Sequence, residues 1–84
     1  MNEETFFYTI DGHDNAIIGR CVSSGRYMYS MQKILNDLVF EHGMTHEDAD
    51  EFFWYNIERS LPYFGEGAPL IVDDVTWDIN LLYN

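Results

Sequence analysis

Acidic side chains are the most informative residues of this chain, because few basic residues are present to neutralise them. The 84 residues include 15 Asp and Glu but only 4 Lys and Arg, which gives a formal net charge of −11 at pH 7. Such an excess repels phosphate groups and anionic lipids and attracts basic protein surfaces. We therefore expect no direct binding to nucleic acid or to a membrane, and a partner with a positively charged surface.

Three of the acids are spaced so that they would share one face of a helix. At 100° per residue, Glu47, Glu51 and Glu58 fall within about 40° of one another, with Trp54 and Tyr55 beside them. The candidate partner-binding residues are these five, the neighbouring acids and the two acids after the last apolar run: Glu47, Asp48, Asp50, Glu51, Trp54, Tyr55, Glu58, Asp73 and Asp74.

This acidic helix face has two interpretations. Duplex DNA carries about one negative charge per 1.7 Å of its axis, so a rigid protein with regularly placed carboxylates could occupy a groove built for phosphates. Trp54 and Tyr55 would then provide the aromatic anchors that dominate interface energies. The alternative is a solvated helix face, which many helices have and which needs no partner.

Histidine and cysteine positions do not indicate a metal site. His42 and His46 have the four-residue spacing of two zinc ligands on a helix, but Gly43 and a helix start at Thr45 interrupt it. Cys21 is the single cysteine, so it cannot form an internal disulfide, and we expect it to be a small buried side chain. The sequence predicts no metal and no cofactor.

No catalytic pattern is present either. The oxygen-rich run Asp11–Asn15 lacks the spacing of a calcium-binding EF-hand loop and reads as a turn. His13 and Cys21 would lie on neighbouring strands of a hairpin, but one Cys with one His is a weak indication of a nucleophile. Gly65 and Gly67 flank an acid that would repel phosphate. We expect the chain not to be an enzyme.

The N-terminal half predicts a hairpin followed by a helix. Aromatic and β-branched residues at 6–10 and apolar residues at 16–22 are typical of strands, and the turn residues between them predict a β-hairpin. Residues 27–29 could extend a strand. Ser30 is a candidate helix N-cap, apolar residues then recur at helical spacing from Met31 to Val39, and Gly43 would follow the helix end.

The C-terminal half predicts a second helix and a third strand. Thr45 with Asp48 resembles a capping box, and Pro62 should end the helix near Ser60. Asn56 falls on the apolar side with Phe52, so we expect a buried, hydrogen-bonded amide. Residues 70–72 read as a strand, and the apolar tail 75–84 should pack. The expected fold is α+β, one domain over residues 1–84, with a small antiparallel sheet and two helices on one face in the order β-β-α-α-β.

Residues 29–73, about half of the chain, resemble a group of small phage and prophage proteins that have no assigned activity. The shared pattern is Gly-Met-Thr, then an Ala, then aromatics with Asn, then Pro-Tyr-Phe-Gly and Ala-Pro. In this sequence the pattern comprises Gly43, Met44, Thr45, Ala49, Phe53, Tyr55, Asn56, Pro62, Tyr63, Phe64, Gly65, Ala68 and Pro69. The resemblance implies a phage or mobile-element origin, and it places Asn56 in the structural part of the pattern.

These observations together favour an inhibitor of a host machine. The first hypothesis is an anti-CRISPR-like phage protein that mimics DNA and blocks the basic nucleic-acid-binding surface of a host protein, such as a subunit of a CRISPR effector. The alternative is an acidic interaction or regulatory module without DNA mimicry, and a third reading makes the apolar tail a homodimer contact. The acidic N-terminus lacks the features of a signal peptide, and no apolar run approaches the ~20 residues that span a bilayer, so we expect the host cytoplasm.

Overall fold

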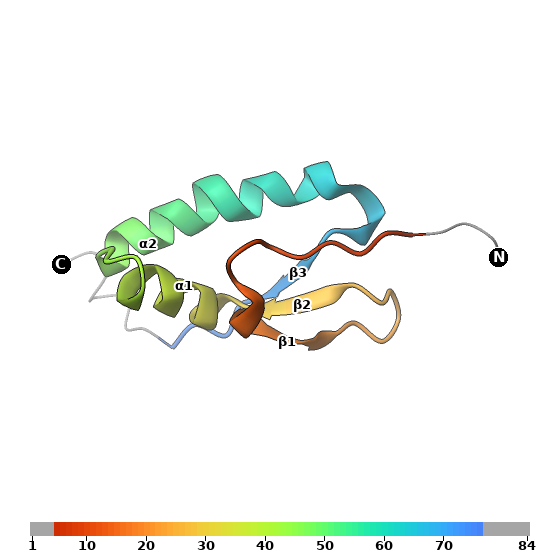
Figure 1. Cartoon of the computed structure of the whole chain (residues 1–84), viewed down its shortest axis with the longest axis horizontal. Helices are drawn as coiled ribbons and strands as arrows, with labels where there is room; N and C mark the ends of the chain where they lie inside the picture. Colours follow the sequence, from red (N-terminus) through yellow and green to blue (C-terminus); the bar gives the residue numbers. More distant parts are fainter. Residues whose placement is uncertain (1–4, 77–84) are drawn as a thin grey trace.

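A computed structural model of the chain describes residues 5–76 and shows an α+β fold (Figure 1). The described elements, in chain order, are the 3₁₀ helix η1 (Asp14–Ala16), strands β1 (Ile17–Arg20) and β2 (Tyr27–Ser30), helix α1 (Met31–Phe40), helix α2 (His46–Phe52), the π-helix η2 (Phe53–Ile57), the 3₁₀ helix η3 (Glu58–Gly67) and strand β3 (Leu70–Val72). The predicted fold class is confirmed. Of the predicted packed tail 75–84, Val75 is partly buried against the core, and residues 77–84 lie outside the described residues.

The sheet is mixed, whereas the sequence predicted an antiparallel one. Its three strands have the order β1-β2-β3, with β1 and β2 antiparallel and β2 and β3 parallel. Helices α1, α2, η2 and η3 form the connection from β2 to β3. A long helical crossover returns the chain to the starting end of the sheet, and the strand that follows is therefore parallel.

The predicted hairpin has different strands. Residues 6–10 form no strand, and β1 pairs with β2 through a turn in which the N–H of Cys21 donates to the carbonyl of Arg26 at 2.8 Å. Residues 6–10 instead run beside the end of η3, where the N–H of Tyr8 donates to the carbonyl of Gly67 at 3.1 Å. A Cβ atom on Gly67 would collide with the backbone carbonyl of Phe6, so this close approach requires glycine.

Both predicted helix starts are confirmed. The side chain of Ser30 accepts a hydrogen bond from the N–H of Lys33 at 3.1 Å, and that of Thr45 accepts one from the N–H of Asp48 at 3.0 Å. Each bond satisfies one backbone N–H that has no partner within its helix.

The predicted end of the second helix near Ser60 is wrong, because helical structure continues through Pro62 as far as the kink at Gly65. Proline fixes φ near −65°, which a 3₁₀ turn also uses, so in η3 it removes one N–H donor without forcing the chain out of a helical conformation. The break comes at Gly65, whose φ of 77° and ψ of −147° are not helical. Figure 1 shows α2, η2 and η3 as one long helical segment that runs alongside α1 and the sheet.

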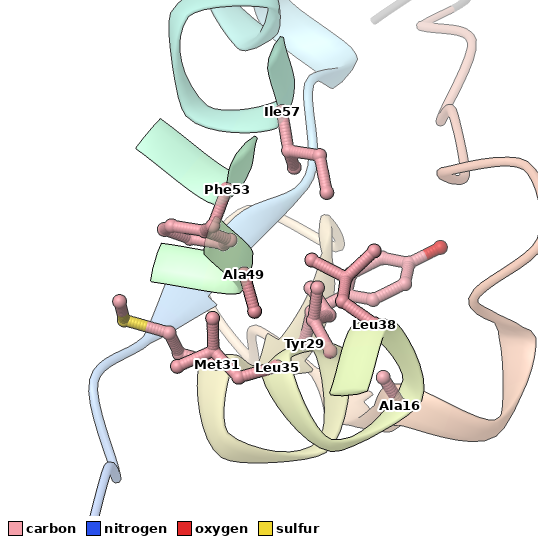
Figure 2. Packing of buried hydrophobic residues seen from close by; sticks show 9 residues of the cluster. Ala16, Tyr29, Met31, Leu35, Leu38, Ala49, Phe53 and Ile57 are labelled. Atoms are coloured by element: carbon pink, nitrogen blue, oxygen red, sulfur yellow. The ribbon is translucent and has the colours of Figure 1, made fainter. Parts of the chain in front are cut away.

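The core lies between this long helical segment, α1 and β2 (Figure 2). Tyr29 of β2 and Phe53 of η2 are its largest fully buried side chains. Of the predicted apolar positions of α1, Met31, Ile34, Leu35 and Leu38 are confirmed as core, and Val39 is partly buried against them. They pack with Ala49 and Ile57. The core therefore fixes which side of the long helical segment faces solvent.

Candidate interaction surface

The first turns of α2 carry exposed carboxylates. Glu47, Asp48 and Glu51 are exposed, and Tyr55 beside them is 64% exposed. Glu47 and Asp48 lie in the first turn, where the positive end of the helix dipole stabilises negative charge. We call Glu47, Asp48, Glu51 and Tyr55 the acidic face. Asp48, Glu51 and Tyr55 line a shallow hollow together with Met44 and Phe52.

Glu58 lies apart from the acidic face. It is half-buried and lines a different hollow, together with Trp54 and Asp73. A regular α-helix turns by about 100° per residue, but η2 is a π-helix, whose wider turn changes the angular position of every residue after it. Seven of the nine candidate residues therefore divide between two surfaces, with Glu47, Asp48, Glu51 and Tyr55 on one and Trp54, Glu58 and Asp73 on the other. Asp50 is half-buried and, like Asp74, lines neither surface.

The π-helix also changes the environment of Asn56. The sequence predicted a buried amide, but Asn56 is exposed, and so is Phe52, at 37%. Ala49, Phe53 and Ile57 fill the buried side of the segment instead. The prediction of Asn56 as a core residue is therefore wrong, and the reason is the same change of helical period.

The second surface is a groove between the long helical segment and β3. Its volume is about 390 Å³. One wall is the helical stripe Trp54, Glu58, Leu61 and Pro62, and the other comprises residues 68–71 and Asp73. The floor is apolar, since it includes the buried side chains of Phe53, Met31 and Pro69. We call this surface the strand groove.

Asp74 belongs to the scaffold. Its Oδ2 accepts a hydrogen bond from the Ser30 hydroxyl at 2.6 Å, and its Oδ1 accepts one from the N–H of Gln32 at 2.9 Å. Desolvation alone would raise the pKa of Asp74, but these hydrogen bonds together hold that pKa below its ordinary value. Asp73 and Asp74 are both exposed, but only the Asp74 carboxylate is bonded to the start of α1. Asp73 lines the strand groove, and its Oδ1 accepts from the N–H of Val75 at 3.3 Å.

The arginines do little to neutralise the acids, because they contact rings and backbone carbonyls. The Arg20 guanidinium lies 4.7 Å from the ring centre of Tyr27, and that of Arg59 lies 5.6 Å from the ring centre of Tyr55. The Nε of Arg26 donates to the carbonyl of Ala68 at 2.6 Å. These contacts leave the net charge of −11 in place, and this charge would attract a basic partner surface.

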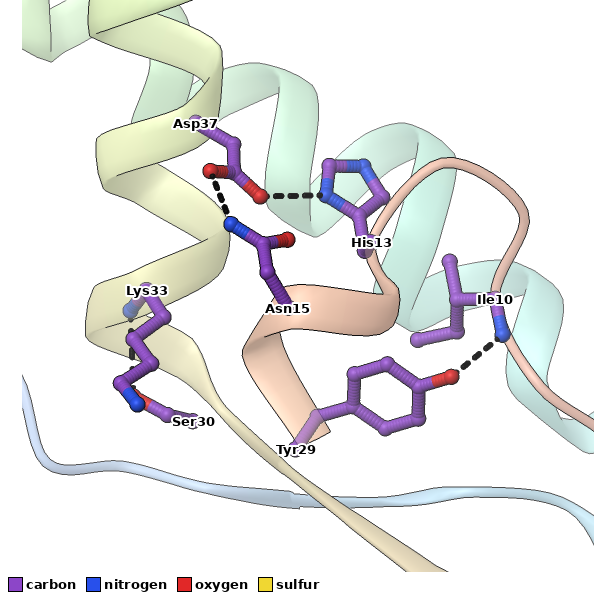
Figure 3. A network of polar contacts seen from close by, with 7 residues as sticks. All are labelled: Ile10, His13, Asn15, Tyr29, Ser30, Lys33 and Asp37. Atoms are coloured by element: carbon purple, nitrogen blue, oxygen red, sulfur yellow. Dashed lines mark hydrogen bonds and ion pairs between the residues drawn. The ribbon is translucent and has the colours of Figure 1, made fainter. Parts of the chain in front are cut away.

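His13 and Cys21 do not form a pair. His13 is buried, with its Nδ1 3.3 Å from the Oδ2 of Asp37, and the Asn15 amide donates to the other oxygen of that carboxylate at 3.0 Å (Figure 3). The Sγ of Cys21 lies 3.3 Å from the Ser23 hydroxyl. The predicted arrangement of His13 and Cys21 on neighbouring hairpin strands is wrong, because the residues 6–10 are not a strand.

Cys21 is only partly buried, which corrects its prediction as a buried side chain. Hydrogen bonds from Ser23 and then Ser24, in the turn between β1 and β2, lower the pKa of the thiol to about 6. Among residues 5–76 no cluster of three or more His, Cys, Asp and Glu side chains is arranged to hold a metal ion. None of the helices in the same range has the length and apolar character needed to cross a membrane.

Comparison with known proteins adds no relative: no family model, curated protein or solved structure matches the chain significantly.

Proposed function

We propose that this protein inhibits a nucleic-acid-binding protein by occupying its basic surface with the acidic face. The observation that carries the proposal is the exposed group Glu47, Asp48 and Glu51, beside the aromatic ring of Tyr55, in a chain of net charge −11. Carboxylates fixed on a capped helix can pair with the Lys and Arg side chains that otherwise bind phosphates. Nucleic acid would then be excluded by competition.

The specific form of this proposal is an anti-CRISPR-like phage inhibitor acting in the host cytoplasm. The resemblance of residues 29–73 to phage and prophage proteins supports the phage origin. The charge and the exposed Tyr55 and Trp54, 64% and 45% exposed, support a protein partner. Because the candidate acids lie on two surfaces, the proposed DNA-mimicking surface comprises only the acids on the first turns of α2. Glu58 and Asp73 lie on the strand groove and would contact a partner separately.

The test is recovery of a partner from lysate of CRISPR-bearing bacteria on the immobilised protein. The proposal expects a DNA-binding complex that elutes with moderate salt and with duplex DNA, because exposed charge pairs are screened by salt. The Glu47→Lys/Glu51→Lys variant should recover at least about tenfold less of the partner complex than the wild type. A control with the same charge change at two other exposed acids, Glu41→Lys/Glu66→Lys, should retain most binding.

Circular dichroism should first show that both variants are folded, because Glu47 also stabilises the start of α2. Equal loss in both folded variants would mean that net charge alone attracts the partner. A partner that resists salt and duplex DNA would favour the alternative function, an acidic interaction module that does not mimic DNA. The strand groove is the observation that favours this alternative.

A further inference from the structure

The strand groove has an open strand edge along one wall. Strand β3 pairs with β2 on one side, and no other strand within residues 5–76 pairs with its second side. Backbone N–H and C=O groups alternate between the two sides of a strand, so some of those in Leu70–Val72 point away from β2. Such an edge can accept a further strand.

The groove beside this edge has room for side chains and an apolar floor. Its volume of about 390 Å³ lies within the range of pockets that bind small ligands in proteins. Phe53 and Met31 are buried at its floor, Leu61, Leu70 and Ile71 are half-buried at its sides, and Trp54 is 45% exposed at its rim. An aliphatic or aromatic side chain entering the groove would bury the exposed parts of Trp54, Leu61, Leu70 and Ile71.

The carboxylates of the strand groove favour a ligand with basic side chains. Glu58 and Asp73 place a carboxylate on each of its two walls. The cation of the groove, Arg26, donates through its Nε to the carbonyl of Ala68, which holds it against the backbone. The groove thus combines an apolar floor, two acids and a strand edge with which no strand of residues 5–76 pairs. These features together fit an extended peptide with both apolar and basic side chains.

We infer that the strand groove binds an extended segment of a partner protein, which pairs with β3 as a fourth strand. One apolar side chain of the segment sits over Phe53 and Met31, and a Lys or Arg lies between Glu58 and Asp73. This inference goes beyond the proposed function, since it concerns a different surface and requires no competition with nucleic acid. It holds whether or not the partner binds DNA.

The experiment is selection of peptides of about eight residues, a strand with short flanks, from a random display library on the full-length protein. Selected peptides should combine an apolar residue with Lys or Arg at alternating positions. A synthetic copy of the best peptide should shift the backbone amide resonances of Leu70, Ile71 and Val72 in an NMR titration. Two further copies are N-methylated on alternate residues, one copy on each alternate set. The copy whose methylated nitrogens face β3 should bind at least about tenfold more weakly, because it cannot donate the strand hydrogen bonds.

Two charge-matched variants locate the contact. Glu58→Lys/Asp73→Lys should weaken the peptide at least about tenfold, whereas Glu47→Lys/Glu51→Lys, with the same change in net charge, should weaken it less than about threefold. The inference is overturned if no peptide is selected, if the shifts lie outside the groove, if N-methylation has no effect, or if both variants weaken binding equally. The N-methylated peptides leave the protein unchanged, so the test does not depend on the stability of a variant. None of these results bears on the acidic face, so the two proposals can fail separately.

Discussion

The Oδ2 of Asp74 lies 2.6 Å from the Oγ of Ser30, which joins the residue that follows β3 to the residue that caps α1. Ser30 accepts from the N–H of Lys33, and Asp74 accepts from the N–H of Gln32. Two of the first N–H groups of α1 are therefore satisfied by side chains from segments 44 residues apart in sequence. This links the parallel strand to the helix that begins the crossover.

Replacement of Asp74 should therefore lower stability. We expect Asp74→Ala to reduce the free energy of unfolding by about 1 kcal/mol, the typical loss for a helix cap. Ser30→Ala should reduce the free energy of unfolding by a similar amount. The double variant should lose less than the sum of the two single losses, because the two side chains share one hydrogen-bond network. Urea unfolding measures all three variants. The control is Asp73→Ala at the adjacent exposed position, and equal stability of Asp73→Ala and Asp74→Ala would contradict the capping role.

The contribution of Asp74 should depend on pH. Its pKa is lower in the folded protein than in the unfolded chain, so the folded state binds the proton less tightly. The stabilisation is therefore complete above the unfolded value, about 3.9, and is lost as the pH falls through the folded pKa. The difference in unfolding free energy between wild type and Asp74→Ala should be largest near pH 7 and shrink below about pH 4. A difference that stays constant down to acid pH would show that the charge of Asp74 is unimportant.

The hydroxyl of Tyr29 should stabilise the N-terminal segment. Tyr29 is fully buried, and its Oη accepts a hydrogen bond from the N–H of Ile10 at 2.7 Å (Figure 3). Tyr29→Phe keeps the packing and removes this acceptor, which should cost about 1–2 kcal/mol. Hydrogen exchange should show faster exchange of the Ile10 amide. Tyr27→Phe, on the same strand but only partly buried, is the control and should leave that amide unchanged.

Cys21 should react as a thiolate near neutral pH. With a pKa of about 6, most of the thiol is ionised at pH 7, whereas an ordinary cysteine ionises near 8.5. The rate of alkylation by iodoacetamide should therefore rise to a plateau with a midpoint close to pH 6. Ser23→Ala removes the hydroxyl that lowers the pKa most and should move the midpoint upward. A midpoint near 8.5 in the wild type would contradict the lowered pKa.

The sequence by itself determined the class of the fold, the helix starts and much of the core. Ser30 and Thr45 were identifiable as caps because a cap depends on a side chain and an N–H three residues away. The apolar positions of α1 were identifiable because its helical period is regular. The acidic character of the surface followed from composition alone.

The tertiary structure decided where the candidate residues lie relative to one another. The π-helix η2 placed Glu58 and Trp54 on the strand groove and exposed Asn56. No local pattern in the sequence predicts such a change of helical period. Asp74 became part of a cap only because the parallel strand β3 ends beside the start of α1. Residues 6–10 have the composition of a strand, yet their hydrogen bonds go to Gly67 and Tyr29. The physical reason is the same for Asp74 and for residues 6–10: composition and period describe local preference, whereas partners distant in sequence decide which backbone and carboxylate groups are already bonded.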